Sequence, residues 1–205
     1  MKKILTKGQL SALIVILVLV IDQIIKIWVK TSMYLHESIK ITDWFYIYFT
    51  ENNGMAFGME IFNKFFLTGF RVIAAIAITW LLVQYVKKNY KTGFLVCVSL
   101  ILAGAVGNII DCVLYGEIFS ESTRSQLANF VPLGEGYSDW FYGKVVDMFY
   151  FPLFTFPDWV PLLGGEIFFS PIFNLADSYI TVAIFILIIF YHKDFNDTIE
   201  RYTKK

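Results

Sequence analysis

The chain has 205 residues, of which 57% are hydrophobic, 19% aromatic and 17% charged. A soluble domain usually carries about 25% charged residues, so this composition, with a mean hydropathy of +0.61, favours an integral membrane protein. The formal net charge is +0, which gives no support for nucleic acid as a partner.

Four segments are long and apolar enough to be spanning helices. Such a helix needs about 20 mostly apolar residues, and the segments lie at about 10–29, 65–86, 92–115 and 171–191. The first follows Lys2, Lys3 and Lys7, but no small-residue cleavage site comes after it. We therefore predict a retained helix rather than a signal peptide. Pro171 suits the first turn of the last helix.

Basic residues predict the orientation of these spans. Ten Lys or Arg residues lie before the first span, between the second and third, and in the tail, whereas the long loops at about 30–64 and 116–170 hold five. Because Lys and Arg gather on the cytoplasmic side, both termini should be cytoplasmic and both long loops should face outward. Aromatic and β-branched residues at 39–50 are typical of a strand.

The expected fold is therefore an all-α integral membrane protein. It has four transmembrane helices, a small β-rich outer element and an extended outer loop, and residues 1–205 form a single membrane domain. The outer loops are rich in Trp and Tyr, which favour the membrane interface. We expect both loops to rest on the outer leaflet.

Polar residues within the spans converge toward the outer side. They form three pairs, in the later half of the first span, the outer end of the third and the outer start of the fourth: Asp22 and Lys26, Asn108 and Asp111, Asn174 and Asp177. An ionisable group at this depth costs about 2.5–3.5 kcal/mol on insertion scales, so several at one depth indicate a functional site. Interacting carboxylates titrate jointly, so that one can stay protonated while another ionises, as acid–base hydrolysis requires.

Each residue also has a structural interpretation. The first pair, four residues apart on one helical face, could neutralise itself, the second could join helices by hydrogen bonds, and the third could cap a helix. Asp147 could be an ordinary loop acid. His36 and His192 offer no metal-ligand spacing. Cys97 and Cys112 are expected to be packing residues, because roughly 22 Å of helix would separate them.

Five short motifs contain most of these polar residues. They read IDQIIK at 21–26, NNGMAFG at 52–58, GAVGNIID at 104–111, VVDM at 145–148 and FNLADS at 173–178. In the same order, the lipoprotein signal peptidases (signal peptidase II) carry D-Q-x-x-K, N-x-G-A-A-F-G, G-A-x-G-N-x-x-D-R, V-V-D-F and F-N-x-A-D-S. The chain therefore resembles that family.

The resemblance implies a membrane aspartic endopeptidase without a metal or other cofactor. Its substrate would be a diacylated prolipoprotein, cut just before the lipidated cysteine by water that an aspartate pair activates. The catalytic pair would be Asp147 and Asp177. The residues that bind substrate or support the site would be Asp22, Lys26, Asn52, Gly54, Asn108, Asp111, Asn174 and Ala176. We expect a monomer among the lipids of the bacterial cytoplasmic (inner) membrane, with its active site toward the outer face.

The sequence departs from the family pattern at several positions. Cys112 replaces the Arg that follows the third-helix Asp, and Arg124 is the candidate substitute. Glu51 stands where Arg is common, and Met55 replaces an Ala. The outer loop is longer than usual on both sides of the fourth motif. We expect the extra segments, 117–143 and 150–170, to form a lid or a flap that rests on the membrane.

Two other functions are open from the residues alone. Intramembrane acids also mark ion paths, so a small proton-coupled transporter is one alternative. However, no charged residue lies in the inner half of the third or fourth span. The other alternative is a noncatalytic membrane binding factor, which should tolerate Asn at positions 147 and 177.

Overall fold

The structure is a computed structural model that describes residues 5–53 and 64–194. The chain divides into two compact units. The first, here called the helical unit, contains Met1–Gln23, Phe66–Ile109 and Ala176–Lys205. The second, here called the sheet unit, contains Ile24–Phe65 and Ile110–Leu175. Each unit is described by itself.

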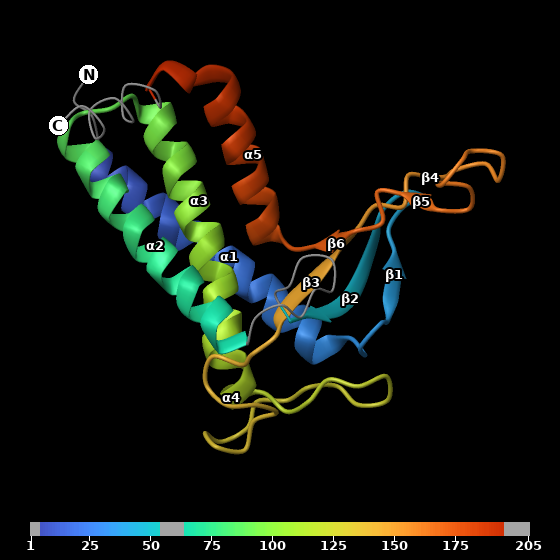
Figure 1. Cartoon of the computed structure of the whole chain (residues 1–205). Coiled ribbons are helices and arrows are strands. Elements are labelled where there is room, and N and C mark those ends of the chain that lie inside the picture. The colour runs from blue at the N-terminus through green and yellow to red at the C-terminus, as the bar shows by residue number, and fades with distance from the viewer. Residues whose placement is uncertain (1–4, 54–63, 195–205) are drawn as a thin grey trace. The chain divides into compact units, whose positions relative to one another are not determined.

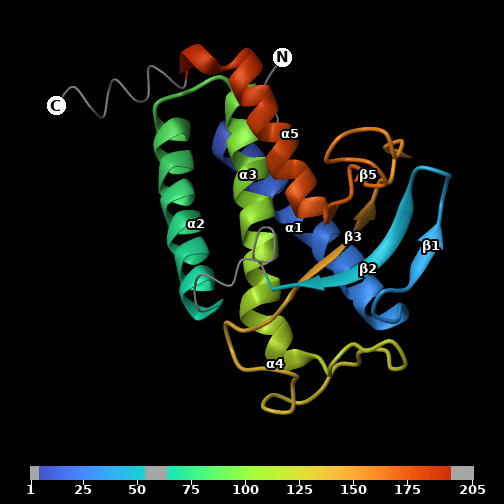
Figure 2. The same cartoon turned by 45° about the vertical axis from the view of Figure 1, so that its right-hand side comes forward.

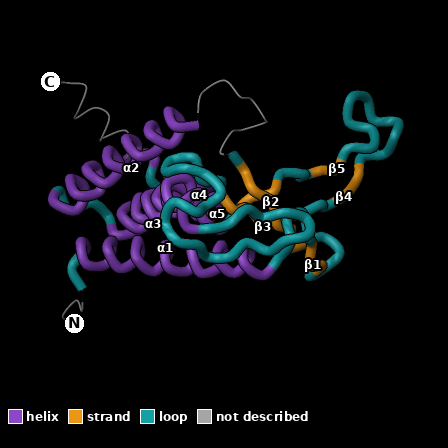
Figure 3. Tube along the Cα trace, turned by 90° about the horizontal axis from the view of Figure 1, so that it is seen from below, coloured by secondary structure: helices purple, strands orange, loops and turns teal. Residues whose placement is uncertain are grey.

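Four helices run side by side in the helical unit (Figure 1). They are α1 (Lys7–Ser32), α2 (Lys64–Lys87), α3 (Thr92–Ile110) and α5 (Leu175–Phe190), each of which also contributes one or more terminal residues to the sheet unit. In the view of Figure 3, α3 lies between α1 and α2. Accordingly, α3 has the longest buried face, and its Phe94, Leu95 and Val98 pack with Leu82 and Tyr85 of α2.

In the part of the chain that the structure describes, three helical stretches are long and apolar enough to cross a membrane: Lys7–Ser32, Lys64–Lys87 and Thr92–Ile118. The outer face of α2 carries large exposed apolar side chains such as Phe66, Phe70 and Ile73, as expected of a helix that faces lipid. The chain is therefore a multi-pass membrane protein, and the first three predicted segments coincide with the candidate spans.

The fourth predicted span is shorter than expected. The apolar helix α5 has 16 residues and begins at Leu175, so placing Pro171 in its first turn was wrong. The physical reason is that Ile172–Phe173 is the strand β6, which pairs with Tyr150 and Phe149 of a neighbouring strand. At about 1.5 Å per residue, α5 alone is roughly 24 Å long.

Gly104 makes α3 and α5 approach closely. A Cβ at this position would lie 2.5 Å from the Ala176 carbonyl oxygen and 2.7 Å from Ile180 Cγ1. We expect Gly104→Ala to lower the free energy of unfolding by about 1–3 kcal/mol, because the backbone cannot yield as a side chain can. Thermal unfolding in detergent measures this change.

The matched control is Gly69→Ala in α2, where a Cβ would meet nothing within 4 Å. It should leave stability unchanged or raise it by up to about 1 kcal/mol, since Ala is the better helix former. Equal effects of the two substitutions would contradict the close-packing account.

The sheet unit contains a four-stranded antiparallel sheet with the order β1-β2-β3-β6. Its strands are β1 (Ser38–Lys40), β2 (Tyr46–Asn52), β3 (Val145–Tyr150) and β6 (Ile172–Phe173). The β-rich element expected at 39–50 is present, but as two strands joined by a turn. Two backbone amides, those of Ile41 and Thr42, donate to the Phe45 carbonyl and close that turn.

The core of the sheet unit lies between the end of α1 and one face of this sheet. Val29 of α1 and Met33, which directly follows α1, pack with Phe49 of β2 and with Val146 and Met148 of β3. Every second side chain of a strand points to the same face. Val146 and Met148, which flank Asp147, both point into this core and so fix the orientation of β3. The alternation therefore sets the direction in which the Asp147 side chain points.

Two long segments of the sheet unit precede and follow β3 (Figure 2). After α3, one π-helical turn, η2 (Asp111–Tyr115), and the short α4 (Gly116–Ile118) lead into the 119–144 loop. Phe119 and Ala128 of that loop are fully buried. The 117–143 segment is thus part of the core, not the separate lid that we expected. Between β3 and β6 lies a second hairpin, made of β4 (Phe154–Thr155) and β5 (Ile167–Phe168).

Candidate functional site

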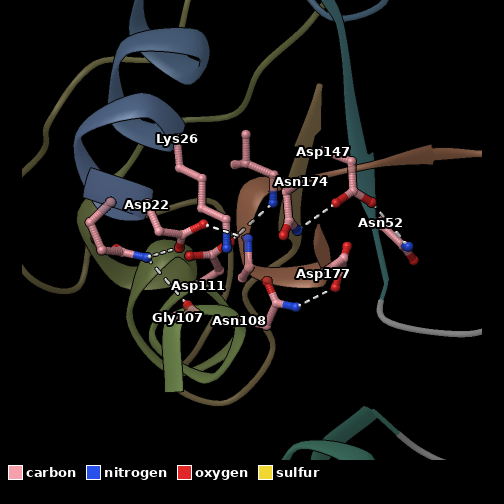
Figure 4. A network of polar contacts seen from close by, with 12 residues as sticks. Asp22, Lys26, Asn52, Gly107, Asn108, Asp111, Asp147, Asn174 and Asp177 are labelled. Atoms are coloured by element: carbon pink, nitrogen blue, oxygen red, sulfur yellow. Dashed lines mark hydrogen bonds and ion pairs between the residues drawn. The ribbon is translucent and has the colours of Figure 1, made fainter. Parts of the chain in front are cut away.

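In the sheet unit, two asparagine amides hold the Asp147 carboxylate. The side chain is 2% exposed. Asn174 Nδ2 donates to Oδ1 at 2.7 Å, and Asn52 Nδ2 donates to Oδ2 at 3.2 Å (Figure 4). Asn52 ends β2 and Asn174 follows β6, so the two strands that flank β3 bring these amides to it. Asp147 is therefore a buried, oriented acid and not an ordinary loop residue.

A buried ion pair supports the same strand. Lys26 Nζ lies 2.8 Å from Asp111 Oδ2, and both side chains are 0% exposed. The same oxygen accepts a hydrogen bond from the backbone N–H of Val146 at 3.2 Å. The pair thus connects α1 and the π-helical turn to the residue just before Asp147. π-Helical turns within longer helices are frequent at functional sites.

In the helical unit, Asp177 accepts a similar amide. Asn108 Nδ2 donates to Asp177 Oδ1 at 2.8 Å, and Asp177 is half-buried in the first turn of α5. Each of the two predicted catalytic aspartates therefore accepts a hydrogen bond from an asparagine of another motif.

Asp22 caps the start of α5 from a different helix. Its Oδ1 accepts the Ala176 backbone N–H at 3.1 Å, one of the N–H groups that a helix start leaves without an internal partner. Gln23 Nε2 donates to Asp22 Oδ2 and to the Gly107 carbonyl, both at 3.2 Å. A Cβ at Gly107 would lie 2.6 Å from Asp22 Oδ2, so only glycine permits this approach. Ala176 therefore takes part through its backbone.

The polar pairs found in the sequence are divided between the two units. Three of the boundaries between the units fall inside a pair, so the helical unit contains the three residues Asp22, Asn108 and Asp177. The sheet unit contains the other three: Lys26, Asp111 and Asn174. The chain therefore passes from one polar cluster to the other within four residues at each of three boundaries.

The remaining expectations from the sequence concern Gly54, Arg124, the two cysteines and metal binding. Gly54 lies outside the described residues. Arg124 is exposed, and the cation that contacts Asp111 is Lys26, so Arg124 does not fill the expected role. Cys97 and Cys112 are buried free thiols, which confirms them as packing residues. Within residues 5–53 and 64–194, no group of three His, Cys, Asp or Glu side chains could hold a metal ion.

Sequence reasoning missed a buried network around Glu51. Lys30 Nζ lies 2.5 Å from Glu51 Oε1 and 3.0 Å from Ser122 Oγ, and Ser122 Oγ donates to Glu51 Oε1 at 2.9 Å. Lys144 Nζ is 3.2 Å from Glu51 Oε2, an ion pair without hydrogen-bond geometry. The Lys30 ammonium also lies over the Tyr137 ring, 4.8 Å from its centre.

This network gives the 117–144 segment a role. The segment supplies Ser122, Tyr137 and Lys144, which surround Glu51. Glu51 directly precedes Asn52, whose amide holds Asp147. The only signal in the sequence was that Glu51 departs from the family's Arg. A carboxylate is needed here because two buried or half-buried lysines face it.

The pKa of Glu51 provides a test. Burial raises the pKa of this carboxyl, but the Lys30 ammonium and the other donors outweigh burial and hold the pKa below its usual value of 4.5. A lowered folded-state pKa contributes stability above the unfolded-state pKa, and this contribution is lost as the pH falls through the folded-state value. We expect Glu51→Gln to lower the melting temperature near pH 7, and the gap to wild type to close as the pH falls below about 4.5.

Glu121→Gln is the matched control, because Glu121 is an exposed carboxylate of the 119–144 loop that packs around Glu51. It should follow wild type throughout the titration. A wild-type advantage over Glu51→Gln that stays constant from about pH 7 to about pH 3 would refute the account.

Comparison with known proteins gives concordant matches over nearly the whole chain. The family model described as signal peptidase (SPase) II matches residues 14–193. A lipoprotein signal peptidase of Porphyromonas gingivalis is 50% identical over 192 residues, which cover 91% of this chain and 84% of the relative. A lipoprotein signal peptidase of Amoebophilus asiaticus is 35% identical over 203 residues, covering 92% and 80%.

The fold has solved counterparts. A bacterial membrane enzyme determined by the in meso method at 2.3 Å resolution is 28% identical. The superposition has a TM-score of 0.60 and covers 91% of this chain and 90% of that one. A second structure of such an enzyme, at 1.9 Å resolution, is 29% identical with a TM-score of 0.59.

Proposed function

This chain belongs to the signal peptidase II family, and we propose that it is a membrane aspartic endopeptidase that removes signal peptides from diacylated prolipoproteins. It cuts just before the lipidated cysteine. One observation carries the aspartic assignment: the two aspartates of the fourth and fifth motifs, Asp147 and Asp177, each accept a hydrogen bond from an asparagine side chain.

The reaction proposed for this pair is hydrolysis by water. An ionised aspartate takes a proton from water as the water oxygen attacks the scissile carbonyl. The other aspartate, protonated, donates a hydrogen bond to the developing oxyanion. Collapse of the tetrahedral intermediate breaks the C–N bond, and an aspartate proton passes to the leaving amine. The roles of base and acid belong to the pair and not to one named residue.

The asparagines orient the acids for this step. An amide N–H orients each carboxyl group without adding charge. A neutral donor therefore leaves room for one acid to be ionised and the other protonated. Lys26 and Asp111 neutralise each other and position β3, while Asp22 positions the first turn of α5. Asn52 is also a supporting residue, because its amide holds Asp147. Gly54, in the same motif as Asn52, is proposed to bind substrate.

We further propose that residues 1–205 form one membrane domain with four spans. α5 would be the fourth span, its 16 residues matching a locally thin bilayer or extending into the residues after it. Both termini would be cytoplasmic, because the basic residues gather on their side. The site would then face outward across the inner membrane, where a signal helix leaves the bilayer, and the enzyme would act as a monomer among membrane lipids.

Cleavage of a defined substrate tests the function. Purified protein in liposomes is given a diacylated prolipoprotein and, as the matched control, the same prolipoprotein without the diacylglyceryl group. We expect a gel shift for the diacylated substrate only, with a new N-terminus at the lipidated cysteine by mass spectrometry. No cleavage, under conditions in which the Porphyromonas gingivalis relative cleaves, would reject the proposal in favour of transport or binding.

A further inference from the structure

The hairpin formed by β4 and β5, residues 151–170, exposes large apolar side chains at its tip. Trp159 is 81% exposed and Leu162 is 101% exposed. Further exposed apolar residues of the same hairpin are Leu153, Phe154, Leu163, Ile167, Phe168 and Phe169. Single exposed apolar residues are common, but a contiguous group of this kind marks an interaction surface.

The hairpin is an ordered element. Phe154 pairs with Phe168 across the two strands, and their rings stack at 4.8 Å between centroids. The Phe156 N–H donates to the Glu166 carbonyl at 2.9 Å, and the Gly165 N–H donates to the Phe156 carbonyl at 3.0 Å. These bonds hold the tip in a fixed shape, so its apolar surface is presented in a defined arrangement.

The backbone of the tip is also strained in a way that presents Leu162. Its φ is +67°, a left-handed conformation that a branched apolar side chain rarely adopts. A leucine with this backbone and a fully exposed side chain is doubly unfavourable in water. Such an outlier points to a function for the side chain. Insertion of Leu162 into an apolar phase would offset both costs.

The charges of the hairpin indicate which apolar phase this is. Asp158 and Glu166 are its only charged residues, and it contains no Lys or Arg. An anionic surface therefore gives it no electrostatic attraction, and contact must be apolar. A tryptophan near the tip suits the interface between headgroups and acyl chains, where Trp is enriched.

Chain connectivity links the hairpin to an apolar helix through a few residues. β5 leads to β6, and one residue separates β6 from the apolar helix α5. Within the sheet unit, the hairpin projects from the sheet away from α4, in the views of both Figure 1 and Figure 2. Its tip is therefore not covered by the 119–144 loop.

We propose that the hairpin is a membrane anchor whose tip, with Trp159 and Leu162, inserts into the bilayer interface. This inference uses the multi-pass membrane character of the chain and does not depend on the peptidase reaction. The anchor would hold the sheet unit against lipid. The apolar side chains of the tip would contact the acyl chains of the bilayer.

A spin label tests the insertion directly. Leu162→Cys is labelled with a nitroxide in the full chain in phosphatidylcholine liposomes. The native Cys97 and Cys112 are buried, and unlabelled wild type checks that they do not react. Ser125→Cys, at an exposed polar position of the 119–144 loop, is the matched control. The measurement compares collision with oxygen, which concentrates in lipid, and with a water-soluble nickel chelate.

We expect oxygen to exceed nickel accessibility several-fold at position 162 and the reverse at 125. Adding anionic phosphatidylglycerol should change neither value, because the hairpin carries no cation. A label at 162 that behaves like the one at 125 would overturn the proposal. Low collision with both reagents would also overturn it, because it would indicate a protein contact. If Leu162→Cys does not fold, Trp159→Cys and Leu163→Cys take its place in the same comparison.

Discussion

Asp147→Asn and Asp177→Asn should each reduce cleavage of diacylated prolipoprotein by about 10²–10⁴-fold, the contribution of a positioned acid or base. Asn has the shape of Asp but can neither take nor give the proton. In Asp177→Asn the retained oxygen can still accept from Asn108. In Asp147→Asn the new NH₂ group faces one of the two amide donors, so Asn52 or Asn174 must turn its amide to present an oxygen. The measurement is the initial rate by gel shift, with thermal unfolding to show that each variant is folded.

Two further variants sharpen this result. The double variant, with Asn at both positions, should be about as active as the less active of the two single variants. The effects of residues that act as a unit are not additive. Asp43→Asn is the matched control, since Asp43 is an acid of the same sheet unit whose side chain is 93% exposed. It should retain wild-type activity. Full activity in Asp147→Asn would show that the pair is wrong and would make Asp111 the next candidate.

Lys26→Met should be strongly destabilising. It removes one partner of a fully buried ion pair and leaves the Asp111 carboxylate without the ammonium that lies 2.8 Å from it. Breaking a buried pair in this way costs roughly 3–5 kcal/mol. Activity should fall as well, because Asp111 holds the Val146 N–H next to Asp147. The unfolding free energy in detergent measures the first effect.

The double variant Lys26→Met with Asp111→Asn separates charge burial from packing. It should recover much of the lost stability, because no uncompensated charge remains. Its activity should stay below wild type if Asp111 also positions β3. Lys40→Met is the control: its pair with Asp43 is exposed, so no measurable change in stability is expected. A Lys26→Met variant as stable as Lys40→Met would disprove the role of the buried pair.

The sequence alone determined the membrane character, the first three spans and the family. Hydropathy is a property of consecutive residues, and a spanning helix satisfies its own backbone hydrogen bonds, so length and apolarity suffice to predict it. The five motifs were also local, which is why Asp22, Asn108, Asp147 and Asp177 could be selected as site residues without coordinates.

Partner choice was decided only by the tertiary structure. Helical spacing offered Asp22 as a neighbour of Lys26, and only the fold added that Lys26 contacts Asp111 and that Asp22 caps a helix that starts at Leu175. The contact between Lys30 and Ser122 joins residues 92 positions apart. No local pattern encodes such a contact, because it depends on strand register and on the faces that packed helices turn toward each other.

The start of α5 shows the same division. Residues 171–191 are apolar throughout, and hydropathy cannot distinguish a strand from a helix within such a run. Ile172–Phe173 pair with β3 as a strand and therefore do not join the helix. This pairing places Asn174, the next residue, within hydrogen-bond distance of Asp147. The sequence thus predicted which residues would carry the chemistry, whereas tertiary hydrogen bonding decided which of them meet, since a buried polar group must find a partner wherever the fold provides one.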